Sequence, residues 1–100
     1  MGDTEILTHS KFAENKDSDF RVHLDSANIV EVRLVEVSEL KKSARQEQFA
    51  IVFHGPLTPF LQQQLYGMDH ESFGDFELFL VPVGQDEAGF LYEAVFNRLL

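Results

Sequence analysis

The sequence predicts a single all-β domain, either a small antiparallel β-barrel or a sandwich of about six strands, with a short helix near the N-terminus. Short runs of alternating apolar and polar residues recur along the chain, and turn-forming residues separate them at regular spacing. The chain has 100 residues, 44% of them hydrophobic, which suits one domain with one core. We expect the domain to occupy residues 1–100, with its core within about residues 8–97.

Residues 4–14 are expected to form the short helix. Thr8 is a residue type that caps helix N-termini well, and Phe12 would turn its ring toward the core. Polar residues from Asn15 onward end the pattern. The chain has ten Phe and no Trp, so we expect rings without polar groups to fill much of the core.

Residues 20–24 and 29–37 form the first predicted hairpin, because apolar and polar side chains alternate in both and a turn-rich segment joins them. Pairing Val22 with Val30 keeps the two apolar sets on one face of the sheet. In this register, oppositely charged residues face each other across the two strands. These pairs are Arg21 with Glu31 and Asp19 with Arg33.

Apolar runs bounded by turn residues predict the remaining strands, which are residues 48–53, 64–69, 76–83 and 90–97. We expect residues 38–47 to form a solvated loop, and residues 54–56 (His-Gly-Pro) to end the strand before them. Gly74 suits a turn that needs a positive φ. Pro82 has no amide hydrogen, so we expect its strand to lack a partner on one side at that residue.

The acidic composition limits the classes of partner. A formal net charge of −9 repels phosphate backbones and anionic lipid headgroups, so we expect neither a nucleic-acid nor a membrane partner. Because the chain has no cysteine, it forms no disulfide and offers no thiolate ligand, which fits a reducing compartment. The N-terminus is acidic and lacks the apolar run of a signal peptide, so we expect a cytoplasmic location.

Five stretches of the chain carry a resemblance to a known family. They are residues 53–56 (Phe-His-Gly-Pro), 64–66 (Gln-Leu-Tyr), 69–70 (Asp-His), 76–83 (Phe-Glu-Leu-Phe-Leu-Val-Pro-Val) and 92–97 (Tyr-Glu-Ala-Val-Phe-Asn). Together they resemble an uncharacterised bacterial family of small β-rich domains of unknown function, over about residues 8–97. The resemblance implies a compact β-rich fold and no assigned activity. The family favours a small residue after the glutamine, where this chain has Leu65.

The chain lacks the sequence motifs of common enzyme classes. It has no nucleophile elbow, no P-loop, no dinucleotide-binding glycine motif and no H-E-x-x-H. We therefore favour a protein without catalytic residues, metal or cofactor. Two alternatives remain: a zinc site built from His54, His70 and Asp69, and an acid–base pair of Glu77 and Glu93. Histidines that bond turn backbone and solvated glutamates are the simpler interpretations.

We expect the domain to be a non-enzymatic protein-interaction or assembly module. Its partner would be another protein or a second copy of the chain, and Pro82 and residues 96–100 offer an edge or patch for it. The alternative is a small-molecule-binding β-barrel. Its pocket would lie near His54, Tyr66 and His70, with His54 or Tyr66 as the polar anchor.

Overall fold

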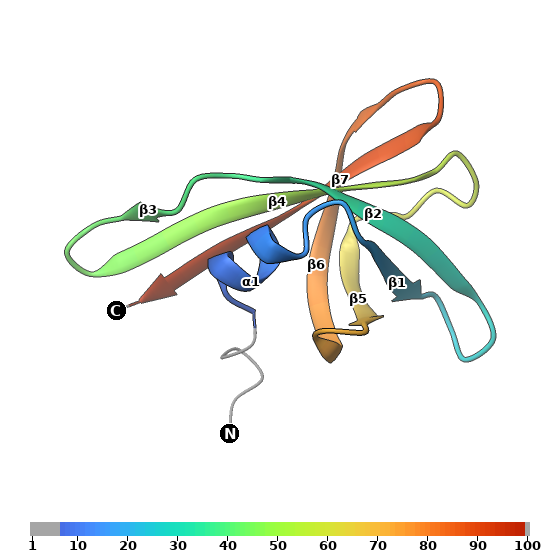
Figure 1. Cartoon of the computed structure of the whole chain (residues 1–100). Coiled ribbons are helices and arrows are strands. Elements are labelled where there is room, and N and C mark those ends of the chain that lie inside the picture. Colours follow the sequence, from blue (N-terminus) through green and yellow to red (C-terminus); the bar gives the residue numbers. More distant parts are fainter. Residues whose placement is uncertain (1–6, 100) are drawn as a thin grey trace.

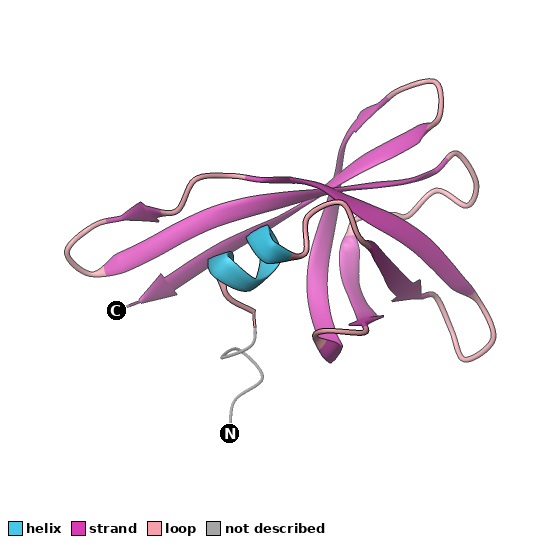
Figure 2. Ribbon diagram, in the orientation of Figure 1, coloured by secondary structure: helices cyan, strands magenta, loops and turns pink. Residues whose placement is uncertain are grey.

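The computed structural model describes residues 7–99 and contains one short helix and seven strands (Figures 1 and 2). In chain order they are α1 (His9–Glu14), β1 (Asp19–His23), β2 (Ile29–Val37), β3 (Lys41–Lys42), β4 (Gln46–Pro56), β5 (Gln64–His70), β6 (Gly74–Gln85) and β7 (Gly89–Leu99). All the strand pairs are antiparallel. The predicted all-β class is confirmed.

Six strands close into a barrel rather than a sandwich. Their order around the ring is β2-β1-β5-β6-β7-β4, and pairing between β2 and β4 closes it. Arg33 of β2 lies opposite His54 of β4 at this closure. The seventh strand, β3, pairs with the first residues of β4 outside the ring. Closure leaves the barrel with paired strands all round its middle, where an open sheet would have two free edges.

The predicted register of the first hairpin is confirmed. Val22 lies opposite Val30, and both side chains are buried. Asp19 lies opposite Arg33, and their side chains form an ion pair, with 3.3 Å between Oδ1 and Nε. Arg21 lies opposite Glu31, although its guanidinium group binds a carboxylate of β5 instead. The alternation of apolar and polar residues was therefore sufficient to set this pairing.

Three predicted element boundaries need correction. The strand predicted to end before residues 54–56 continues through them, because β7 supplies a partner for every residue of β4 up to Pro56. Within the predicted loop at 38–47, Lys41–Lys42 forms β3 against Glu47 and Gln48. The helix begins at His9, where the Thr8 side chain caps it as predicted; residues 4–6 lie outside the described residues.

Two predictions about single residues are confirmed. Gly74 has a φ of 71°, a conformation that glycine adopts without strain, and it starts β6. Pro82 pairs with Tyr92 of β7 on one side only, since β5 reaches no further along β6 than Leu80. The missing amide hydrogen of Pro82 therefore breaks no strand pairing on its open side.

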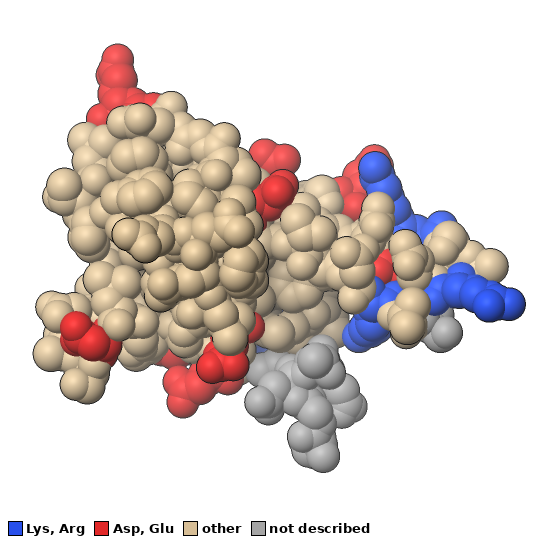
Figure 3. Space-filling model, turned by 180° about the vertical axis from the view of Figure 1, so that it is seen from behind, with Lys and Arg blue, Asp and Glu red and all other residues tan. Residues whose placement is uncertain are grey.

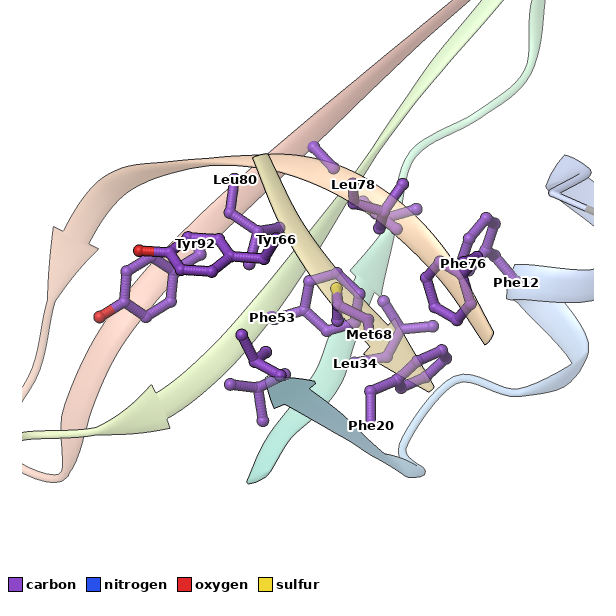
Figure 4. Packing of buried hydrophobic residues seen from close by; sticks show 14 of the residues in the cluster. Phe12, Phe20, Leu34, Phe53, Tyr66, Met68, Phe76, Leu78, Leu80 and Tyr92 are labelled. Carbon is purple, nitrogen blue, oxygen red and sulfur yellow. The ribbon is translucent and has the colours of Figure 1, made fainter. Parts of the chain in front are cut away.

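Phenylalanine-rich packing fills the barrel, as expected from the composition. Buried side chains from every strand of the ring meet in one cluster (Figure 4). Phe20 and Phe53 meet edge to face, with 5.2 Å between ring centroids. The two tyrosines of the cluster keep their hydroxyl groups bonded: Tyr66 donates to Gln62 O at 2.7 Å, and Tyr92 accepts from Leu61 N at 2.9 Å.

Two strands of the barrel extend beyond it as an arm. The pairing of β6 with β7 stops at Val81 and Glu93, whereas β4 and β7 stay paired as far as Gln46 and Leu99. We call the extension formed by β3, residues 46–50 of β4 and residues 95–99 of β7 the arm (Figure 1). Helix α1 packs Phe12 against the inner face of the arm. The molecule is elongated accordingly, measuring 42 × 30 × 23 Å.

Candidate functional site

The three residues predicted to form a pocket lie on two faces of the sheet. In β4, Phe53 and Gly55 face the core, so the intervening His54 faces outward. Its Nε2 lies 3.0 Å from Oδ1 of Asp86 in the β6–β7 turn. Tyr66 and His70 occupy buried positions of β5. The structure brings Tyr66 and His70 onto the same inner face and does not bring His54 to them.

His54 and Asp86 organise the turn between β6 and β7. Oδ1 of Asp86 also accepts hydrogen bonds from the amides of Ala88 and Gly89, each at 2.9 Å. The hydrogen bond from His54, followed by these amides, holds the pKa of Asp86 below its usual value. His54 thus bonds a side chain of this turn, whereas the simpler interpretation had it bond turn backbone.

Tyr66 is a core residue whose hydroxyl group is already bonded to Gln62 O. Burial raises the pKa of Tyr66, and nearby Tyr92 adds to the rise. The neutral phenol donates its hydrogen bond to a backbone carbonyl, and this bond helps to fix segment 57–63 over the barrel. It has no free donor to offer a ligand.

His70 is a buried imidazole held by hydrogen bonds on both nitrogens. The amide of Ser72 donates to Nδ1 at 3.0 Å, so the proton of the neutral ring resides on Nε2. Nε2 then donates to Oγ of Ser18 at 2.8 Å, and this hydroxyl group donates to Asn15 O at 2.6 Å. The chain of bonds ties β5 to the segment after α1, and it needs the imidazole neutral.

The surroundings of His70 favour that neutral form. Its ring lies 4.1 Å from the ring of Phe20, centroid to centroid, and 5.3 Å from that of Phe73. Burial lowers the pKa of His70 below the ordinary value of 6.5, against the opposing effect of Glu71. The folded state therefore binds fewer protons at this ring than the unfolded chain does between the two pKa values.

We expect acid to weaken the fold through His70. Its contribution to stability is complete above pH 6.5, the unfolded value, and is lost as the pH falls toward the lower folded pKa. Urea unfolding of the wild type and of His70→Gln measures this. The variant should be less stable than the wild type near neutral pH. The difference between their free energies of unfolding should narrow on acidification, because the variant has no imidazole to protonate at this position.

His54→Gln is the matched control for the pH experiment. His54 is partly exposed and bonds Asp86 at the surface. Above the pH range in which Asp86 titrates, its replacement should leave the acid loss of stability close to that of the wild type. A gap between wild type and His70→Gln that stays constant with pH would contradict the assignment of the acid effect to His70.

The zinc alternative has no geometric support. His54 and His70 lie on opposite faces of their strands, and both oxygens of Asp69 are engaged, by Arg21 and by His23. Although burial raises its pKa, these two bonds hold the pKa of Asp69 below the usual range overall. Within residues 7–99, no three His, Asp or Glu side chains are grouped closely enough to hold a metal ion.

The two glutamates considered as an acid–base pair lie far apart. Glu93 is opposite Val81, and Glu77 lies four residues before Val81 on β6, which is about 13 Å along a strand. Glu77 is exposed and Glu93 is half-buried. Arg98 pairs with Glu47 of β4 and with neither of these glutamates, with 2.8 Å between Nη2 and Oε1.

The most distinctive surface is an apolar strip on the outside of the barrel. We define the outer wall as the outward-facing side chains of Leu65 on β5, Phe79 and Val81 on β6, and Leu91 and Val95 on β7. The strand register makes it continuous, since Leu65 lies opposite Phe79 and Val81 lies opposite Glu93, which is flanked by the two β7 residues.

Large apolar side chains of the outer wall are in solvent. Leu65 is 56% exposed and Phe79 is 49% exposed. Glu93 is the one carboxylate inside the wall, and the ion pairs formed within residues 7–99 involve other carboxylates. Figure 3 shows a broad uncharged face over the barrel, with lysine and arginine gathered on the arm. Sequence reasoning missed this surface, although the apolar run at 76–83 carried the signal.

A family model described as a domain of unknown function (DUF6916) matches residues 7–96. The chain belongs to this family. No curated protein and no solved structure matches the chain. The expected resemblance to a family of unknown function is thus confirmed, and membership of the family assigns no activity. The described residues include no helix with the length and apolar character needed to span a bilayer.

Proposed function

We propose that this domain is a non-enzymatic interaction module that binds a protein partner through the outer wall. The exposure of Leu65 and Phe79 side by side on β5 and β6 is the observation that carries the proposal. Monomeric proteins seldom expose contiguous apolar patches larger than a few hundred Å² unless they serve binding. Apolar side chains on a rigid sheet also lose little conformational entropy when a partner covers them.

The composition of the wall indicates the chemistry of the partner. Phe79 is an aromatic side chain at the centre of the strip, the kind of residue that anchors protein interfaces. Glu93 would lose its hydration when covered, so a matching surface needs a lysine or arginine at that point. We infer an apolar partner surface with one basic group, on a protein rather than on nucleic acid or membrane, because the net charge of −9 repels both of the latter.

The alternative of a small-molecule-binding barrel has weaker support. Among residues 7–99, eighteen apolar side chains pack into the core cluster, and they occupy the interior where such a ligand would bind. The largest side chains there include Tyr92, Phe20 and Phe53, which are fully buried. We also propose a cytoplasmic location, since an acidic module without cysteine suits a reducing compartment. A bacterial source is proposed on the family resemblance alone.

The proposal is tested by affinity capture from a lysate of the source organism, using the wild type and Phe79→Ser as baits. We expect a stoichiometric partner with the wild type, and loss of at least nine-tenths of it with the variant. Removing one central aromatic anchor from an interface typically costs about 2 kcal/mol or more, which is a factor of roughly 30 in affinity.

Ile29→Ser is the matched control for the capture experiment. Ile29 is a similarly exposed apolar residue, but it lies on β2, away from the outer wall. The control should retain the partner in full. Equal capture by all three baits would show that the partner binds elsewhere. Equal loss with both variants would show that the capture reports non-specific binding to exposed apolar side chains.

A further inference from the structure

One edge of the arm is left without a strand partner. On the side away from β4, the pairing of β7 with β6 ends at Glu93, so residues 94–99 pair with no other strand of the described chain. Figure 1 shows β7 as the outermost strand on this side of the arm, diverging from β6. Backbone groups along such an edge form a template for another strand.

The edge lacks most of the features that usually protect one, although Arg98 places a charge on its inner face. Natural edge strands carry lysine or proline, or are very short or bulged. Residues 95–99 continue β7 in unbroken register with β4. On the outer face of this edge, Val95 is 61% exposed and Leu99 is 81% exposed, with Asn97 between them. Nothing charged on that face would repel an incoming strand.

We propose that this edge binds the same edge of a second copy, so that two β7 strands pair antiparallel with Asn97 opposite Asn97. This pairing sets Val95 of each copy opposite Leu99 of the other on the outer face. On the inner face it sets Arg98, which pairs with Glu47 of its own copy, opposite Phe96 of the other copy. The outer face of the segment is thus complementary to itself, because it sets apolar side chains against apolar ones.

Neighbouring registers are less favourable. Centring the pair on Arg98 would place two like charges directly opposite each other. Centring it on Phe96 would set Val95 opposite Asn97, which leaves Leu99 without an apolar neighbour across the interface. The register centred on Asn97 is therefore the one that the side chains select.

The resulting dimer would be closed. The arms of two copies would form one continuous sheet in the order β3-β4-β7-β7-β4-β3, with each free edge satisfied by the other. The same patch serves both copies, so the assembly stops at two and leaves the rest of each barrel accessible. The apolar outer wall meets this interface only at Val95.

The test introduces one charge at the symmetry axis. Asn97→Lys and Asn97→Asp each place like charges opposite one another, which should raise the dimer dissociation constant on the order of tenfold. In an equimolar mixture of the two variants the charges become opposite, and a heterodimer should form at least as tightly as the wild-type dimer. Analytical ultracentrifugation measures each state across a range of concentrations.

Gln46→Lys is the control, because it makes the same change of charge on an exposed residue of the arm that lies on β4, not on the free edge. It should leave the dissociation constant within about threefold. A wild type that stays monomeric at every concentration overturns the proposal. So does a dimer that neither Asn97 variant weakens, since it would use another surface. Phe79→Ser should leave the dimer intact, which separates this test from that of the proposed function.

Discussion

Replacing Phe12 with alanine should lower the free energy of unfolding by about 3–5 kcal/mol. Phe12 is fully buried, and its ring centroid lies 4.7 Å from that of Phe73 and 5.4 Å from that of Phe96. These rings belong to the turn before β6 and to the arm, the two elements that separate where the β6–β7 pairing ends. The Phe12 side chain fills the space between them, and its removal leaves a cavity that rigid strands cannot close.

The helix that carries Phe12 has little stability of its own. Six residues are far too few for an isolated helix in water, so α1 depends on its tertiary contacts. We therefore expect Phe12→Ala to release α1 as well as to leave a cavity. Urea unfolding gives the loss directly. Glu14→Ala, an exposed change on the same helix, is the control and should cost less than about 0.5 kcal/mol. A loss below 1 kcal/mol for Phe12→Ala would contradict the role assigned to the ring.

Gly89→Ala should destabilise the barrel by about 3 kcal/mol. Gly89 opens β7 opposite Pro56, and a Cβ there would overlap the carbonyl oxygen of Gly55 and lie 2.9 Å from Cε1 of His54. Backbone atoms cannot move aside as a flexible side chain can. The strands would have to separate at the point where β4 and β7 begin their pairing, and the turn held by Asp86 would be displaced.

Gly67→Ala provides the comparison for this second experiment. Gly67 lies within β5, and a Cβ at that position meets nothing within 4 Å. Its replacement should change the free energy of unfolding by no more than about 0.5 kcal/mol. Thermal and urea unfolding of the two variants should therefore differ widely. Similar free energies of unfolding for the two variants would mean that the backbone at Gly55 moves away from the added Cβ with little loss of stability.

The sequence was enough to predict the elements that depend on a few neighbouring residues, such as a strand with alternating apolar and polar side chains or a turn with a glycine. The alternation in residues 20–24 and 29–37 predicted the correct register, because a shift by one residue would have exposed every apolar side chain. Pro82 and Gly74 were informative because each has a single strong conformational preference. The helix cap at Thr8 was found for the same reason.

Contacts between segments far apart in the sequence decided the features that the sequence did not predict. A Gly-Pro pair normally ends a strand, yet β4 continues through Gly55 and Pro56 because β7, far along the chain, pairs with them. The separation of His54 from Tyr66 follows from strand parity once Phe53 is known to face inward. The outer wall was harder to find. Residues 76–83 are apolar on both faces, and the sequence alone does not say which face meets the core.

The long ladder between β4 and β7 has a mechanical consequence. Eleven residue pairs run without a break from Gln46 and Leu99 to Pro56 and Gly89, about 33 Å of hydrogen-bonded backbone that belongs to both the arm and the barrel. The pairing has no break between the arm and the barrel that could serve as a hinge. Molecules bound at its two ends would be held apart by the length of the ladder. A structure built from such units would inherit its dimensions from these two strands.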